Sequence, residues 1–409
     1  MNRSLLMTVG IVSILWPSAV FGQENALTLE EALERARRRA PGILVARDRI
    51  AEARGRLVGA SILLQDNPVF EVFAGQRGSS PDQGPSLSAD FGVSQRFELG
   101  GRRKIRTRIA EADVEREIAS SEDTARQLLG EAAIAFLRGL AGQEQVRLAT
   151  TASGNADELL RSVQRRYELG DVPVLEVNLA RTTSARARSD VYAAQSGLAS
   201  ALADLRVFLG MGAEEPVAVT GELRGRHPPE LNEILQRAVQ RADLRALAAE
   251  LRQAEAEVSL GEAYTRPDLG VGFRYEREEK AHVARGGVTL TLPIFARGQD
   301  LRATGQARAA RLRRELEAGQ RVITAEVQGA WEALQHEVRA ADELARNAVT
   351  SLEENELLAR RSYEEGEISL AELLLVRRDA FEIRLLYVQR SLQAAVAEIE
   401  VEARSGVLR

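Results

Sequence analysis

The stretch Phe97-Glu98-Leu99-Gly100-Gly101-Arg102-Arg103-Lys104 marks the point where an alternating segment ends and a long helical segment begins. A similar junction, Phe295-Ala296-Arg297-Gly298-Gln299-Asp300, occurs in the second half of the chain. Before each junction apolar residues recur at every second position, and after it they recur at helical spacing. The same change of period at two places indicates that the chain is built from two repeats.

The first repeat is expected over 23–215. Its opening segment, 28–60, has apolar residues at helical spacing and a break at Pro41-Gly42. The later segment 102–166 lacks proline, and as one helix it would be about 97 Å long, roughly three times the hydrocarbon thickness of a bilayer. The expected elements are strands at about 67–75 and 86–97, a long helix at about 102–166 and a return helix at about 174–209.

The second repeat is expected over 230–409, after a Pro- and Gly-containing linker at 216–229. It follows the same plan, although its long helix and return helix differ in sequence from those of the first repeat. In each repeat a Tyr-x-x-Gly turn separates the long helix from the return helix, with Gly as the helix end signal. The expected elements are a helix over 231–260, strands at about 267–276 and 287–295 with a polar loop over 276–287 between them, a long helix at about 299–362 and a return helix at about 369–404.

Composition argues against several classes of function. The 409 residues carry a formal net charge of -5, and Lys and Arg are interspersed with Asp and Glu along the helices, so no basic surface for nucleic acid stands out. There is no phosphate-binding Gly loop, no serine elbow and no Cys. The three histidines, His227, His282 and His336, are far apart in sequence. We therefore expect no enzyme activity, no cofactor and no metal site.

The N-terminus has Arg3, a short apolar run and small residues at Val20 and Gly22, which indicates a secretory signal peptide over 1–22. A retained membrane anchor is the alternative, but the apolar run is short for spanning hydrocarbon. No later stretch approaches the roughly 20 apolar residues of a transmembrane helix. If the mature chain enters a membrane, it must do so with its strands.

The strands of the two hairpins have one apolar and one polar or small face. Four strands cannot close a barrel alone, and unpaired edges cannot be hydrated in hydrocarbon, so a trimer bringing together about twelve strands is the natural closed solution. The polar face would line the lumen, with Asp90, Asp268 and Arg274 as candidate lumen residues. The alternative is a soluble molecule whose hairpins bury their apolar faces against a helical bundle.

The order and spacing of these segments resemble the TolC-type family of trimeric outer-membrane efflux channels. The resemblance covers essentially the whole mature chain. The junction Gln95-Arg96-Phe97-Glu98-Leu99-Gly100-Gly101-Arg102-Arg103 is similar to the outer-membrane component of heavy-metal efflux systems, the CzcC-like branch. The resemblance implies a mainly helical homotrimer whose twelve-stranded β-barrel in outer-membrane lipid continues into a twelve-helix periplasmic tunnel. It also implies docking to a periplasmic adaptor protein and, through it, to an inner-membrane efflux transporter.

The resemblance places the two turns at the periplasmic tip, where the channel opens and closes. Carboxylates just after the turns narrow the entrance in the family, and a further carboxylate one helical turn on is replaced by Leu375 in the second repeat. Rings of carboxylates would attract cations, whereas solvated residues near a helix N-terminus are the simpler interpretation. The tyrosines could lock the tip through their hydroxyls or merely pack in the turn. The candidate tip and gating residues are Tyr167, Gly170, Glu176, Tyr363, Gly366 and Glu372.

The hypothesis is therefore a passive exit duct of a tripartite efflux pump, which exports heavy-metal cations. A duct for drug efflux or type I protein secretion is the alternative within the family. A periplasmic coiled-coil scaffold or adaptor without a pore is the alternative from another class.

Overall fold

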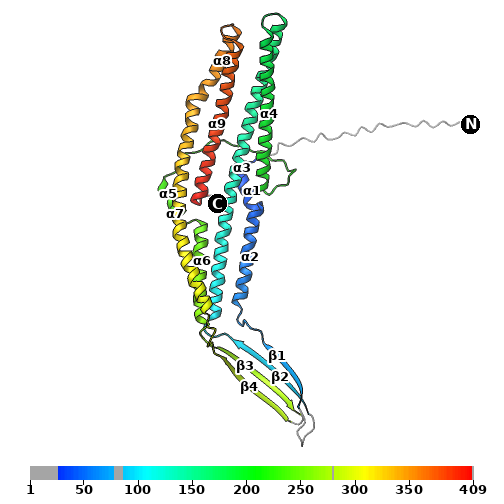
Figure 1. Cartoon of the computed structure of the whole chain (residues 1–409), viewed down its shortest axis with the longest axis vertical. Coiled ribbons are helices and arrows are strands. Elements are labelled where there is room, and N and C mark those ends of the chain that lie inside the picture. The colour runs from blue at the N-terminus through cyan, green and yellow to red at the C-terminus, as the bar shows by residue number, and fades with distance from the viewer. Residues whose placement is uncertain (1–25, 78–85, 279–280, 408–409) are drawn as a thin grey trace, which may run out of the picture.

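The computed structural model describes residues 26–77, 86–278 and 281–407. The expected signal peptide lies outside the described residues. Figure 1 shows an elongated molecule in which a body of long helices continues at one end into a small sheet. The mainly helical fold with a small antiparallel sheet is confirmed. Among the described residues, no helix combines the length and the apolar character that crossing a membrane requires.

The first repeat begins with a capping box, in which the Thr28 hydroxyl accepts from the Glu31 amide and Glu31 accepts from the Thr28 amide at 2.9 Å. Helix α3 has 67 residues, which corresponds to about 100 Å. The elements of this repeat are α1 (Leu29–Arg39), α2 (Pro41–Ser61), β1 (Val69–Arg77), β2 (Ser86–Phe97), α3 (Arg102–Glu168) and α4 (Val174–Phe208).

The second repeat follows the same order. Its elements are α5 (Leu231–Ala238), α6 (Ala242–Ala263), β3 (Asp268–Glu278), β4 (Ala281–Thr291), α7 (Gln299–Leu344), η1 (Ala345–Val349), α8 (Thr350–Glu364) and α9 (Leu370–Ser405). Element η1 is a π-helical turn within the second long helix. It contains neither Pro nor Gly, so no breaker residue predicts it.

Two expectations about the second repeat need correction. The strand expected at 287–295 lies at Ala281–Thr291. Pro293 has no amide hydrogen to donate and ends the pairing, while the charged and Gly residues before Val288 pair with β3 rather than forming a loop. The helix expected from Leu231 breaks before Ala242, where the Arg241 guanidinium turns inward and pairs with Asp243 at 2.7 Å.

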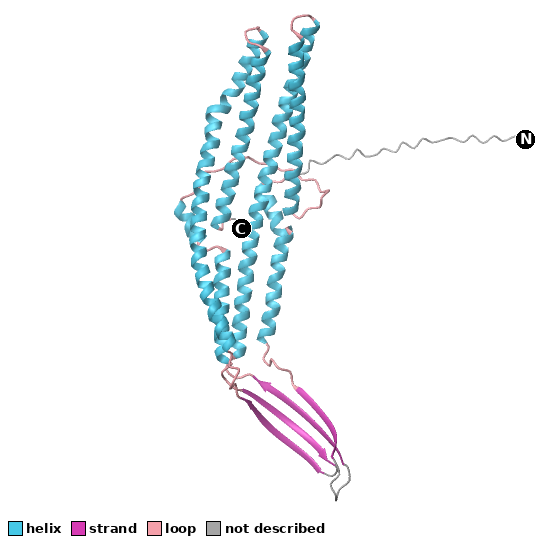
Figure 2. Ribbon diagram, viewed as in Figure 1, coloured by secondary structure: helices cyan, strands magenta, loops and turns pink. Residues whose placement is uncertain are grey.

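The four strands form one antiparallel sheet in the order β1-β2-β3-β4. Paired residues share a face, and the pairings Phe70 with Val93 and Val93 with Phe273 place these apolar side chains together. Strands β1 and β4 are the edges, each paired on one side within the described chain. Figure 2 shows the sheet lying oblique to the helices.

The helices form a row with the same lateral order as the strands. Near the sheet α2 packs on α3, α3 on α6 and α6 on α7, whereas farther away α4 packs on α3, α3 on α9, and α9 on α7 and α8 (Figure 1). Long helices α3 and α7 therefore run the length of the body beside shorter helices stacked end to end. One edge of the body is formed by α2 and α4, and the other by α7 and α8.

Buried arginines satisfy the carbonyls where α9 ends above α6. Arg126 of α3 donates to the Ala403 carbonyl at 2.6 Å, and Arg241 donates to the Arg404 carbonyl at 3.1 Å. The Arg404 carbonyl lies beyond the last helical hydrogen bonds and gains a partner, whereas the Ala403 carbonyl also accepts from the Gly406 amide at 3.2 Å. In the first repeat, the chain just after α4 passes close to the end of α1. A Cβ atom at Gly210 would lie 2.4 Å from the Arg39 carbonyl oxygen, so only Gly allows this close approach.

Candidate functional site

The two turns far from the sheet have the same backbone form. Gly170 has φ of 83° and Gly366 has φ of 80°, a left-handed conformation that suits Gly. Each donates its amide to the carbonyl of the tyrosine that precedes it, Gly170 to Tyr167 at 3.0 Å and Gly366 to Tyr363 at 3.2 Å. These contacts reverse the chain tightly at both tips, which Figure 1 shows side by side at the end opposite the sheet.

The two tips contact each other through Tyr363. Its hydroxyl donates to a Glu176 carboxylate oxygen at 3.3 Å, and the Arg166 guanidinium lies 5.4 Å from its ring centre. The Tyr363 residue is 8% exposed, whereas Tyr167 is 47% exposed and makes no hydroxyl hydrogen bond with the described residues. Apolar side chains from the helices on either side of both turns surround the contact, among them Val163, Val177 and Leu373.

The two repeats differ in the residue that stands just before each return helix, and this residue decides what the following glutamate contacts. Ser369 caps α9, and the Glu372 carboxylate closes the capping box by accepting from the Ser369 amide at 2.7 Å. Pro173 stands at the equivalent place before α4 and has no amide or hydroxyl to offer. Glu372 is therefore held by its own helix, while Glu176 is available to Tyr363.

These contacts shift the acidity of the tip residues. Hydrogen bonds from the backbone and side chain of Ser369 lower the pKa of Glu372. Burial raises the pKa of Tyr363, and the nearby Glu176 carboxylate raises it further, while Arg166 acts in the opposite direction. The Tyr363 hydroxyl consequently stays protonated, and able to donate, at neutral pH.

A second polar cluster lies on the sheet. The Arg274 guanidinium bridges two carboxylates, with Asp90 at 3.0 Å and Glu71 at 3.0 Å. Asp90 lies on the same face as Arg274, because Asp90 pairs with Glu276 and side chains two positions apart share a face. Whether these residues line a lumen stays a prediction.

Asp268, the third candidate lumen residue, lies in a partly buried contact where the sheet meets the helices, and its place in a lumen stays a prediction. The Arg102 guanidinium pairs with it at 2.9 Å, donates to the Arg266 carbonyl at 2.9 Å and lies 4.4 Å from the Tyr264 ring centre. This contact joins the first residue of α3 to the first residue of β3, and sequence spacing did not indicate it. Among the described residues, no group of three or more His, Cys, Asp or Glu side chains could hold a metal ion.

The fold is a helical body with two reversed tips at one end and an open-edged sheet at the other, and comparison with known proteins finds it similar to outer-membrane efflux channels. The family model described as outer membrane efflux protein matches residues 32–211. The structure of CusC, described with the conformational changes that accompany folding and transmembrane channel formation, is 19% identical, covers 92% of this chain and 91% of its own, and has a TM-score of 0.76.

Two relatives extend the match in sequence. The cobalt-zinc-cadmium resistance protein CzcC of Cupriavidus metallidurans is 27% identical over 285 residues, which are 68% of this chain and 66% of the relative. The pyoverdine export outer membrane protein OpmQ of Pseudomonas putida is 26% identical over 326 residues, which are 73% of this chain and 68% of the relative. The resemblance to outer-membrane efflux channels is confirmed.

Proposed function

We propose that the chain forms a trimeric exit duct in the outer membrane, which passes substrate from a periplasmic adaptor and an inner-membrane transporter to the exterior. The observation that carries this proposal is that the helices near the sheet and the strands follow the same lateral order. A second copy placed beside the first extends both layers at once, because α2 and β1 lie at one edge and α7 and β4 at the other. Three copies would close both layers without leaving strand edges in lipid.

The proposed substrates are heavy-metal cations. The support is the similarity to CzcC, whose name records cobalt, zinc and cadmium resistance. The similarity to OpmQ, named for pyoverdine export, supports an organic substrate as the second candidate. The duct is proposed to be passive, with energy supplied by the transporter.

Growth of a deletion strain tests the proposed substrate. We expect sensitivity to zinc, cobalt and cadmium that the restored gene removes, with no change toward dyes, antibiotics or siderophores, because the pump would lose its only outlet for metals. The measurement is growth across concentrations of each compound. Sensitivity confined to organic compounds would be consistent with the proposed duct but would contradict the proposal that it exports metal cations. Recovery of the protein as a soluble monomer, without detergent, would instead support a pore-less periplasmic scaffold.

The tip is proposed as the gate, with the Tyr363 to Glu176 contact holding it closed. Tyr363→Phe removes one hydrogen bond from each protomer, worth about 1 kcal/mol, and leaves the ring in place. We expect a larger open fraction of the reconstituted pore in planar bilayers. Tyr167→Phe is the matched control, since that hydroxyl has no partner among the described residues. Equal open fractions in the two variants would contradict the proposal that the Tyr363 hydroxyl holds the tip closed.

The same contact predicts a pH dependence. The pKa of Tyr363 is raised above its ordinary value of 10.0, so the contact is fully present below about pH 10. It is lost as pH rises through the raised pKa, because the ionised hydroxyl cannot donate and is repelled by the Glu176 carboxylate. The open fraction of the wild-type pore should rise in that range, and Tyr363→Phe should show no such rise.

A further inference from the structure

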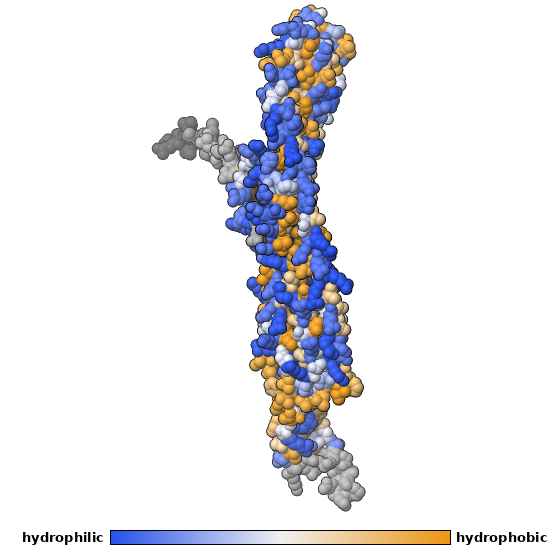
Figure 3. Space-filling view, turned by 90° about the vertical axis from the view of Figure 1, so that its left-hand side faces the viewer, coloured by the Kyte–Doolittle hydropathy of each residue, from blue (hydrophilic) through white to orange (hydrophobic). Residues whose placement is uncertain are grey.

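Exposed apolar side chains gather where the helices meet the sheet, and they concentrate at the two edges of the protomer. At one edge the connection from β4 to α7 exposes Phe295 by 88%, and at the other the connection from α2 to β1 exposes Leu63 by 71%. The central connection from β2 to α3 is less exposed, with Phe97 at 37% and Leu99 at 38%. Figure 3, which views the side occupied by α7, shows apolar residues gathered at this level.

This uneven distribution bears on what covers the apolar residues. Lipid would surround all four connections of a protomer equally, but the other central connection, between α6 and β3, exposes the polar residues Thr265 and Arg266. A neighbouring protomer would cover the edges and leave the centre free. The distribution therefore favours a second copy of the chain over lipid.

The edge helices carry opposite charges at matching heights. Arg314 lies about 22 Å along α7 from its first residue, and Asp48 lies about 20 Å from the last residue of α2. Both helix ends are at the sheet side of the body (Figure 1). Both side chains are exposed, and neither forms an ion pair with the described residues.

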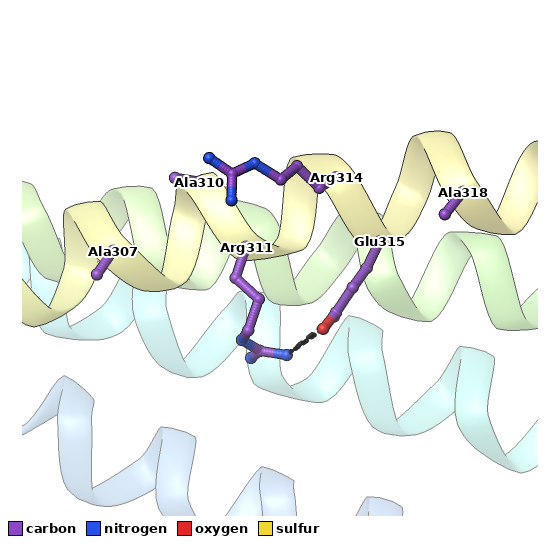
Figure 4. Close-up of a pocket in the computed structure, with 6 residues that line it drawn as sticks. All are labelled: Ala307, Ala310, Arg311, Arg314, Glu315 and Ala318. Atoms are coloured by element: carbon purple, nitrogen blue, oxygen red, sulfur yellow. Dashed lines mark hydrogen bonds and ion pairs between the residues drawn. The ribbon is translucent and has the colours of Figure 1, made fainter.

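Both charged residues lie on faces directed away from the protomer. Helix α7 buries Gly305, Ala309 and Leu312 against α6, and Arg314 lies on its opposite face. Figure 4 shows Arg314 on the other side of α7 from the Arg311–Glu315 pair, beside a hollow of about 550 Å³ lined partly by alanines. Helix α2 buries Ile43, Ala46 and Ala53, and its exposed face carries Asp48 with Ala51 and Gly55.

From these observations we propose that adjacent protomers join along a seam with two parts. Just below the membrane, Phe295 of one protomer packs against Leu63 and its apolar neighbours Ile62 and Leu64 of the next. Farther along the helices, Arg314 of the first protomer pairs with Asp48 of the second. The proposal rests on the proposed trimer and specifies which residues hold it together. Every protomer offers both halves, so the joint is head-to-tail and closes into a ring.

A disulfide test exploits the absence of Cys from the chain. The variant Leu63→Cys with Phe295→Cys, oxidised in outer-membrane vesicles, should give a covalent trimer on non-reducing gels that dithiothreitol converts to monomer. Leu63→Cys with Leu99→Cys is the control and should stay monomeric, because Leu99 lies at a central connection. A trimer that forms in detergent but does not cross-link through the first pair would overturn the apolar part of the seam, as expected for residues covered by lipid.

A charge exchange tests the second part. Asp48→Arg and Arg314→Asp should each reduce the trimer fraction after detergent extraction, and the double exchange should restore it, because the pair is then reversed. Failure of the double variant to recover, when both single variants are expressed and exported, would overturn the pairing. If the wild-type chain itself is extracted as a monomer, the proposed function fails rather than the seam.

Discussion

Arginine at both Val93 and Phe273 should abolish insertion of the protein into the outer membrane. The two residues face each other across β2 and β3 on the apolar face of the sheet, and both are exposed in the protomer. An Arg facing lipid near the bilayer centre costs about 2–4 kcal/mol, and a trimer would carry such a charge at both positions in every protomer. Two like charges directly opposite each other also repel. The loss should appear as protein missing from the heat-modifiable, detergent-extracted outer-membrane fraction.

The matched control places arginines on the opposite face, at Ser94 and Thr289. Both residues are exposed, and each lies opposite a Gly on strand β3, so the new side chains have room. We expect this variant to insert normally. Normal insertion of the Val93 and Phe273 variant would mean that this face does not meet lipid, and the soluble-hairpin interpretation would then be preferred.

Breaking the Arg102 contact should have the second largest effect. Arg102→Ala leaves the Asp268 carboxylate half-buried without its cation, and the carbonyls of Ala263 and Arg266 lose a donor. Removal of one partner from a buried ion pair typically costs about 3–5 kcal/mol. We expect a clear fall in the temperature at which the purified protein loses its helical circular dichroism signal in detergent.

The neighbouring residue provides the control for this experiment. Arg103 is exposed and, among the described residues, donates only to the Ser61 carbonyl at 2.9 Å, so Arg103→Ala should change stability by no more than about 0.5 kcal/mol. Arg102→Lys should recover part of the loss, because it keeps the charge but not the several donors of the guanidinium. Equal melting temperatures for Arg102→Ala and Arg103→Ala would show that the junction does not depend on this ion pair.

The sequence predicts features that local spacing specifies. Alternation in β2 and the Gly residues of the turns are local signals, and the structure has both a strand at Ser86–Phe97 and left-handed Gly170 and Gly366. The end of β4 was misplaced, because exposed apolar residues continue the alternation past Pro293 to Ile294 although pairing has ended. Pattern alone does not distinguish an edge strand from the apolar connection that follows it.

Contacts between distant residues leave no such signal. Tyr363 and Glu176 are 187 positions apart, and Arg102 and Asp268 are 166 positions apart. Asp268 follows the parity of the polar strand face, which predicts a lumen residue, but nothing in its sequence neighbourhood indicates its contact with the arginine at the start of α3. The tip residues were identified through family resemblance, while the division of roles between Glu176 and Glu372 follows from Pro173 and Ser369, which requires the structure.

The oblique sheet has a consequence for the bore of the assembled duct. Neighbouring strands lie about 4.8 Å apart, whereas neighbouring helices lie about 8–10 Å apart, so four upright strands would span only about half the circumference that four helices occupy. A tilted strand covers a longer arc around the axis. In the proposed trimer, the slant of the sheet (Figure 2) would bring the arc of four strands closer to the arc of four helices. Upright strands would leave an abrupt narrowing at the membrane surface.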